Sequence, residues 1–246
     1  MDPFKFTTIA HRNHVFCNPL GEQTVEHCLG LLGLAPEDRV IDVGCGKGEF
    51  LIRLVERTGV HAVGVDRNPG FLREAAERAA ARIPGGKLSL HLTDIAEFRA
   101  EAGSFAAALC IGSTHAYGDY PSTLRALSGL APPGGRILVG EGYWKRDPDP
   151  EYLAFLGARA ADCTDHAGNV AAGVEQGLVP LYTEVSSDAD WDAYEDLYAS
   201  TMGTYVAAHP EDPDANTLGE RMRVWRSGYL RWGRDTLGFG VYLFRK

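Results

Sequence analysis

Residues 40–50 read VIDVGCGKGEF, an apolar run that passes into a turn with glycine at every second position. The first four residues have the branched, apolar character of a buried strand, and Phe50 begins the apolar pattern of a helix. Between them, Gly44, Gly46 and Gly48 permit backbone conformations and a close ligand approach that side chains would block. The stretch predicts a strand, a glycine turn and a helix that together hold a nucleotide-like cofactor.

The spacing of these glycines argues against a dinucleotide. A dinucleotide site needs GxGxxG with the pyrophosphate at the helix N-terminus, whereas this turn has GxGxG. Asp42 stands two residues before the first glycine, where its carboxylate would repel a pyrophosphate but can bind an amino-acid ammonium group, directly or through water. Asp66 ends the next apolar run, where a carboxylate can accept hydrogen bonds from ribose hydroxyls.

Outward from this turn, strand-like and helix-like segments alternate through residues 1–145, which is typical of βαβ units and a parallel sheet. After residue 145 we expect a helix around Leu153 and Leu156, a sixth strand, two helices rich in aromatic residues, and a final strand. The predicted strands are residues 39–43, 61–65, 87–92, 105–111, 136–139, 179–185 and 238–244. The fold class is therefore α/β, a Rossmann-like doubly wound sheet of seven strands with helices on both faces and extra helices between strands six and seven.

The segment from Asp42 to Gly48 resembles motif I of the class I S-adenosylmethionine-dependent methyltransferases, and the resemblance extends over most of the chain. His11-Arg12 and Asn18-Pro19 before the motif, and Gly142-Tyr143-Trp144 after the fifth strand, are similar to a bacterial branch of these enzymes. The resemblance implies S-adenosylmethionine as cofactor, S-adenosylhomocysteine as product and an antiparallel seventh strand.

The resemblance also assigns cofactor contacts. It places Asp66 on the adenosyl ribose, Arg67 and Asn68 beside the adenosine, and Asp94 followed by Ile95 at the adenine. The loop after the fourth strand would lie under the methionine portion. The implied cofactor-binding residues are Asp42, Gly44, Cys45, Gly46, Gly48, Asp66, Arg67, Asp94, Ile95, Cys110 and Gly112.

Methyl transfer from a sulfonium is an in-line displacement, so the protein must align the acceptor, exclude water and, where needed, remove a proton. The carboxyl ends of strands four and five face the cleft of such a sheet. His115 is our first candidate for a general base, since its ordinary pKa suits proton transfer at neutral pH; the alternative is a packing or hydrogen-bonding role. Glu141 is the second candidate, and its alternative is a structural cap or salt bridge.

Several residues are expected around the acceptor. Tyr117, Tyr143 and Trp144 would shape an aromatic acceptor pocket. Residues 1–20 precede the first expected helix and would form a lid, with His11, Phe16 and Asn18 facing the cofactor. His11, His14 and Cys17 lack a clear fourth ligand, so we expect no metal. The whole chain, 1–246, is predicted to be one domain, with a cofactor-binding half at 21–145 and a substrate-side half at 146–246.

Composition limits the partners. The net charge of −9 would repel nucleic-acid backbones and acidic membrane surfaces. No apolar run approaches the ~20 residues that span a bilayer. Five cysteines, an odd number with no CxxC pair, fit a reducing compartment. We therefore expect a cytoplasmic protein with a small-molecule acceptor, no nucleic-acid or membrane partner, and the possibility of an oligomer.

The same fold class also hosts four other functions. An oxidoreductase conflicts with the glycine spacing. A nucleic-acid methyltransferase conflicts with the charge and with the absence of an Asn-Pro-Pro-Tyr-like tetrapeptide or a Pro-Cys nucleophile after strand four. A protein-side-chain methyltransferase and a non-catalytic S-adenosylmethionine-binding protein stay open. The predicted activity is methyl transfer to oxygen or nitrogen of a small-molecule acceptor.

Overall fold

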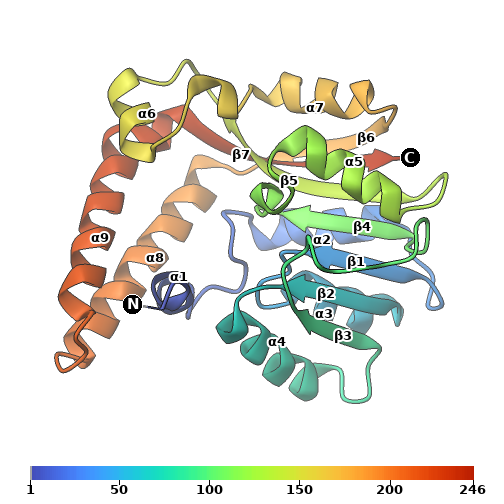
Figure 1. The fold of residues 1–246 in the computed structure, drawn as a ribbon, viewed down its shortest axis with the longest axis horizontal. Helices are drawn as coiled ribbons and strands as arrows, with labels where there is room; N and C mark the ends of the chain where they lie inside the picture. Colours follow the sequence, from blue (N-terminus) through green and yellow to red (C-terminus); the bar gives the residue numbers. More distant parts are fainter. Residues whose placement is uncertain (1) are drawn as a thin grey trace.

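Seven strands form a single mixed sheet in the order β3-β2-β1-β4-β5-β7-β6 (Figure 1). The computed structural model describes residues 2–246. β1 to β5 pair in parallel, and β7 runs antiparallel to both β5 and β6. The strands are β1 (Arg39–Val43), β2 (His61–Asp66), β3 (Leu88–Leu92), β4 (Ala107–Ile111), β5 (Arg136–Trp144), β6 (Val179–Val185) and β7 (Leu237–Arg245). The predicted fold class and the antiparallel last strand are confirmed.

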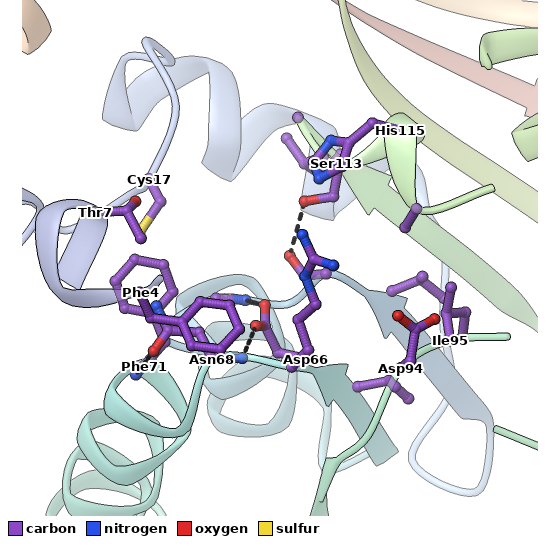
Figure 2. A pocket seen from close by; sticks show the side chains of 18 of the residues that line it. Phe4, Thr7, Cys17, Asp66, Asn68, Phe71, Asp94, Ile95, Ser113 and His115 are labelled. Atoms are coloured by element: carbon purple, nitrogen blue, oxygen red, sulfur yellow. Dashed lines mark hydrogen bonds between the residues drawn. The ribbon is translucent and has the colours of Figure 1, made fainter. Parts of the chain in front are cut away.

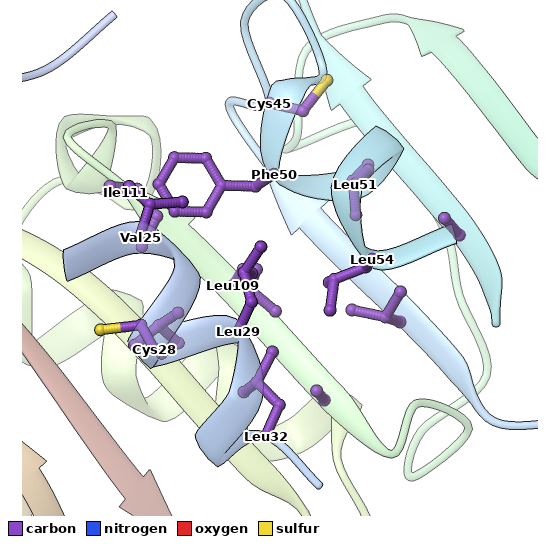
Figure 3. Packing of buried hydrophobic residues seen from close by; sticks show 14 of the residues in the cluster. Val25, Cys28, Leu29, Leu32, Cys45, Phe50, Leu51, Leu54, Leu109 and Ile111 are labelled. Carbon is purple, nitrogen blue, oxygen red and sulfur yellow. The ribbon is translucent and has the colours of Figure 1, made fainter. Parts of the chain in front are cut away.

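Helices cover both faces of the sheet, because each strand presents an apolar side chain to each face in turn. On one face pack α2 (Glu22–Leu31), α3 (Glu49–Thr58) and α4 (Pro69–Arg82), and on the other α5 (Tyr120–Leu130) and α7 (His166–Glu175). Figure 3 shows Leu29 of α2 and Leu54 of α3 meeting Leu109 of β4 in the first of these layers. This packing fixes the carboxyl ends of β1, β2 and β4.

A helical layer stands beside the sheet (Figure 1). It consists of α8 (Asp188–Ala208) and α9 (Ala215–Gly228), which continues through η3 (Tyr229–Gly233) and α10 (Arg234–Thr236) into β7, with α6 (Pro150–Leu156) at one end. The short α1 (Lys5–Ala10) packs on this layer through Phe6 and Ile9, which contact Met202 and Leu218. The predicted N-terminal lid is therefore partly a helix docked on α8. Within residues 2–246, no helix combines the length and the apolar character needed to cross a membrane.

The structure corrects two details of the predicted elements. β5 continues to Trp144 rather than ending at residue 139, because it pairs with β7 along its whole length while β4 accompanies it only to Gly140. The helix α7 was not predicted, because small residues replace most of its apolar stripe. A Cβ at Gly173 would lie 2.2 Å from the Phe244 ring, so this helix needs glycine to approach the sheet.

Candidate active site

The glycine turn after β1 adopts the conformation that its sequence predicts. Gly44, Gly46 and Gly48 have φ values of +72°, +54° and +70°. A Cβ at Gly44 would lie 2.3 Å from the Cβ of Ser113, so the loop after β4 packs directly on the turn. The Gly44 and Cys45 N–H groups donate to the Val65 carbonyl oxygen at 2.8 and 3.1 Å. The turn is thereby fixed between the ends of β2 and β4.

A pocket of about 720 Å³ opens above this turn, at the carboxyl ends of β1, β2 and β4 (Figure 2). Its volume lies within the range of small-molecule sites. The pocket brings together many of the predicted residues, which come from the N-terminal segment and from the loops after β1, β2, β3 and β4. Those in its lining are His11, Gly44, Gly46, Asp66, Arg67, Asn68, Asp94, Ile95, Gly112 and His115.

Two carboxylates mark one side of the pocket. Asp66 accepts hydrogen bonds from the Gly46 N–H at 2.8 Å and from the Asn68 N–H at 2.8 Å, which fixes its carboxylate at the pocket wall. The Asn68 side chain in turn caps α4 by accepting from Gly70 and Phe71. Asp94 stands at the end of β3, across the pocket floor from Asp66 (Figure 2). This side of the pocket therefore offers acceptors for hydroxyl and amino groups.

Asp42 lies beneath the turn and not in the main pocket. It shares a cavity of about 30 Å³ with Asn18 and Gly44, which is enough space for a water molecule. Asp42 Oδ1 and Asn18 Oδ1 are buried and have no hydrogen-bond partner among the residues that the structure describes. Burial, and secondarily the charge of Asp66, raises the pKa of Asp42 to about 8. Two unpaired buried acceptors at this position call for a hydrogen-bond donor, such as water or an ammonium group.

A buried lysine ties the N-terminal segment to the turn. Lys47 Nζ donates to the Arg12 and His14 carbonyl oxygens at 3.3 and 2.5 Å and to Glu74 at 3.1 Å. Its side chain is only 1% exposed. Residues 12–14 are therefore held against the glycine turn.

His11 and Tyr194 meet on the opposite wall of the pocket. His11 Nδ1 lies 2.9 Å from the Thr7 carbonyl oxygen and Nε2 lies 2.8 Å from the Tyr194 hydroxyl. Because a carbonyl can only accept, we assign the imidazole proton to Nδ1, and Nε2 then accepts from the tyrosine. Burial lowers the pKa of His11 to about 4, so the ring is neutral. The arrangement leaves the Tyr194 oxygen with its lone pairs free for a donor in the pocket.

The two predicted base candidates occupy different positions. His115 stands on η1 (Thr114–Tyr117), is exposed, and lines the pocket. Glu141 lies outside the pocket lining, accepting from the Thr114 hydroxyl and, at 2.7 Å, from the Gly142 N–H. Burial raises the pKa of Glu141. Its contact with Thr114 ties β5 to the short helix that carries His115.

Six other predicted residues also lie outside the pocket lining. The Cys45 and Cys110 side chains point into the hydrophobic layers on opposite faces of the sheet, and Gly48 serves as the left-handed N-cap of α3. Tyr117 packs against the β4–β5 layer. The extension of β5 carries Tyr143 and Trp144 away from the pocket. Tyr143 packs on His166, and Trp144 Nε1 donates to the Ala160 carbonyl oxygen at 2.8 Å.

The histidines near the N-terminus are engaged in hydrogen bonds. His14 Nε2 lies 3.0 Å from the Tyr194 carbonyl oxygen, and His11 makes the contacts described above. Among residues 2–246, no group of three or more His, Cys, Asp or Glu side chains is arranged to hold a metal ion.

Comparison with known proteins identifies the family. A family model described as a methyltransferase domain matches residues 40–135. The Escherichia coli protein YjhP is 27% identical over 98% of each chain, and its X-ray structure superposes with a TM-score of 0.90, covering 98% of this chain and 99% of that one. A SAM-dependent methyltransferase from Geobacter sulfurreducens, solved in complex with S-adenosyl-L-homocysteine, has a TM-score of 0.91 at 25% identity, covering 98% of this chain and 97% of that chain.

The chain belongs to the class I S-adenosylmethionine-dependent methyltransferases. Part of this methyltransferase is also similar to the ubiquinone biosynthesis O-methyltransferase of Aromatoleum aromaticum, with 32% identity over 54% of this chain and 58% of that protein. The motif that predicted the family, residues 42–48, lies inside the region matched by the family model.

Sequence reasoning missed part of the methyltransferase pocket. Phe4, Thr7 and Tyr194 line it but were not assigned to the site. Tyr194 belongs to an aromatic series at helical spacing, for which the sequence favours a core role and leaves a substrate wall or a dimer face as alternatives. Only its pairing with His11, 183 positions earlier in the chain, shows that one side of this helix faces the pocket.

Proposed function

We propose that this methyltransferase transfers the methyl group of S-adenosylmethionine to an oxygen or nitrogen of a small-molecule acceptor. The observation that carries the proposal is the contrast between the two sides of the 720 Å³ pocket. One side holds carboxylates above a glycine turn, and the other holds aromatic and uncharged polar groups. The first side suits an adenosyl cofactor and the second a small organic acceptor.

The residues present fit the cofactor. Asp66 would accept hydrogen bonds from the ribose hydroxyls, and Asp94 from the adenine amino group, with Ile95 and Arg67 beside the adenosine. The two unpaired acceptors, Asp42 Oδ1 and Asn18 Oδ1, would receive the ammonium group through a water molecule in the small cavity under Gly44. Bound S-adenosylmethionine supplies an electrophilic methyl group on a sulfonium.

The acceptor side is uncharged. Thr7 lines it, and His11 is neutral because burial lowers its pKa to about 4. Burial likewise raises the pKa of Cys17 to about 12 and raises that of Tyr194. A cationic protein side chain would have no countercharge on this wall, which favours a neutral small molecule over a lysine or arginine side chain. The similarity to an O-methyltransferase of ubiquinone biosynthesis supports the same class of acceptor.

His115 is the proposed general base. It lines the pocket, and no described residue is hydrogen-bonded to its ring, so the imidazole is available to an acceptor O–H or N–H group. Glu141 and Thr114 act as positioning residues for its short helix. Tyr194 would bind a donor group of the acceptor through its free lone pairs.

The test is a screen of small phenols, alcohols and amines with methyl-labelled S-adenosylmethionine. We expect labelled product with at least one neutral acceptor, and His115→Ala should lower turnover roughly 10²-fold or more while leaving S-adenosylhomocysteine affinity within twofold. If His115→Ala lowers S-adenosylhomocysteine affinity by as large a factor as it lowers turnover, the role assigned to His115 is contradicted. Cofactor binding without product from any acceptor would favour the non-catalytic alternative.

A further inference from the structure

The short helix α1 closes one side of the cofactor pocket. Phe4 and Thr7 line the pocket from this segment. Phe4 lies on the side of Asp66 and not on that of His115 (Figure 2). The Arg67 guanidinium stands over the Phe4 ring, with Cζ 5.9 Å from the centroid. Because we assign Asp66 and Arg67 to the adenosine, α1 covers the adenosine part of the pocket.

On its side facing α4, α1 is joined through small and polar groups. The Thr8 hydroxyl exchanges hydrogen bonds with the side-chain amide of Asn68 at 3.0 and 3.2 Å. A Cβ added at Gly70 would lie 2.7 Å from Thr8 Cγ2, so α1 can approach the start of α4 this closely because residue 70 is glycine. Neutral hydrogen bonds contribute little net stability in water, so this side of α1 can separate from α4 at a low cost in free energy.

The opposite side of α1 is bound more strongly, to α8 and α9. Phe6 and Ile9 are each 5% exposed and belong to an apolar cluster with side chains of both helices. Lys5 Nζ forms ion pairs with Asp212 at 2.6 Å and with Asp214 at 2.7 Å. Burial of two large apolar side chains outweighs the hydrogen bonds of one hydroxyl. We therefore expect α1 to stay with α8 and α9 when it separates from α4.

We propose that α1 is a gate over the adenosine part of the pocket. It opens where Thr8 meets Asn68, remains attached to α8 and α9, and sets the rates at which S-adenosylmethionine enters and S-adenosylhomocysteine leaves. Steps of this kind limit turnover in many enzymes. The inference rests on the proposed function, which assigns the Asp66 side of the pocket to the cofactor.

Such a gate has a kinetic signature. The contact between Thr8 and Asn68 is made within the protein, so weakening it raises the open fraction whether or not a ligand is bound. The association and dissociation rate constants should then rise by the same factor, and the dissociation constant, which is their ratio, should stay nearly constant. Loss of a direct contact with the cofactor would instead raise the dissociation rate constant and the dissociation constant together.

The experiment measures the exchange of S-adenosylhomocysteine. A chase of the radiolabelled ligand with an unlabelled excess gives the dissociation rate constant, calorimetry gives the dissociation constant, and the two give the association rate constant. Thr8→Val removes the hydroxyl and should raise both rate constants roughly fivefold. Gly70→Ala places a methyl group against Thr8 and should raise both roughly tenfold, while the dissociation constant stays within about threefold in each variant.

Two control variants locate the opening. Gly129 is also a helical glycine, in α5, and an added Cβ would meet nothing within 4 Å, so Gly129→Ala should leave exchange unchanged. Lys5→Met breaks the ion pairs on the side that stays closed and should change both rate constants less than about twofold. If Lys5→Met accelerates exchange as much as Thr8→Val does, α1 separates from α9 instead, and the proposed direction of opening is wrong.

The remaining outcomes separate the gate from the proposed function. Unchanged exchange rates in both Thr8→Val and Gly70→Ala, or a dissociation constant that rises in proportion to the dissociation rate constant, would overturn the gate and leave α1 as a fixed wall. Normal affinity for S-adenosylhomocysteine in those variants would leave the proposed function intact. Failure of the unmodified protein to bind S-adenosylhomocysteine would contradict the proposed function and, with it, the gate.

Discussion

The two walls of the cofactor pocket are built in different ways. On the cofactor wall, the Asp66 carboxylate meets the Gly46 N–H only 20 positions away in the chain, and most contacts are made by backbone groups. On the acceptor wall, His11 meets Tyr194 across 183 positions, side chain to side chain. On the proposed assignment of the two walls, cofactor recognition is encoded in contiguous motifs, whereas acceptor recognition depends on how distant helices pack. Substitutions on the first wall should affect cofactor binding far more than substitutions on the second.

The largest effect is expected for Gly44→Ala. The new Cβ would lie 2.3 Å from Ser113 at a φ of +72°, which combines steric overlap with backbone strain. We expect a loss of about 3 kcal/mol in the free energy of unfolding, together with loss of S-adenosylhomocysteine binding. Urea unfolding and calorimetry measure the two effects.

Gly85→Ala is the matched control for that substitution. Gly85 has a φ of +73° but no atom within 4 Å of an added Cβ, so only the strain is common to both sites. It should cost about 1 kcal/mol and leave cofactor affinity unchanged. Equal losses in the two variants would mean that contact with Ser113 does not shape the turn.

Asp66→Ala comes next. It removes a carboxylate that accepts from Gly46 and Asn68 and that we assign to the ribose hydroxyls. We expect S-adenosylhomocysteine to bind at least ~10-fold more weakly, equivalent to ~1.4 kcal/mol. Asp165→Ala is the control, because Asp165 also accepts a backbone N–H, from Gly168, but lies at the start of α7. Similar weakening of S-adenosylhomocysteine binding in both variants would contradict the assignment of Asp66 to the ribose hydroxyls.

A pH-dependent effect is expected for Asp42. Its pKa in the folded protein is raised to about 8 from 3.8, so the folded state holds a proton that the unfolded state releases. Stability of the free protein should then fall as the pH rises from about 4 to 8, by at most ~1.4 kcal/mol per unit. Asp42→Asn should reduce the pH dependence of stability measured by thermal unfolding. It should also lower the affinity for S-adenosylhomocysteine several-fold at pH 8. If stability depends on pH in the same way in Asp42→Asn and in the unmodified protein, Asp42 does not hold a proton in the folded state.

The smallest effect on cofactor binding is expected for Tyr194→Phe. Only the hydroxyl that contacts His11 is lost, so S-adenosylhomocysteine affinity should stay within twofold while KM for an acceptor found in the screen rises roughly tenfold. Tyr198→Phe, on the same helix but outside the pocket lining, is the control. Weakened cofactor binding in Tyr194→Phe alone would break the distinction between the two walls.

The same distinction explains how much could be predicted. Alternating apolar segments predicted the seven-stranded sheet, and the GxGxG turn with Asp66 predicted the cofactor edge, because those signals are local in sequence. Asp94 and Gly112 were implied by the resemblance to class I methyltransferases. The extension of β5 depends on pairing with β7, so Tyr143 and Trp144 were expected near the acceptor but lie elsewhere. Tyr194 could not be distinguished from core residues, because its position depends on α1 docking against α8.

The most direct test of the central claim is calorimetric titration of the unmodified protein with S-adenosylmethionine, S-adenosylhomocysteine and NAD. The glycine turn with Asp42 beneath it and Asp66 beside it predicts binding of both adenosyl ligands and none of NAD. Binding of NAD without the adenosyl ligands would contradict the assignment of this pocket and return the chain to the oxidoreductase alternative.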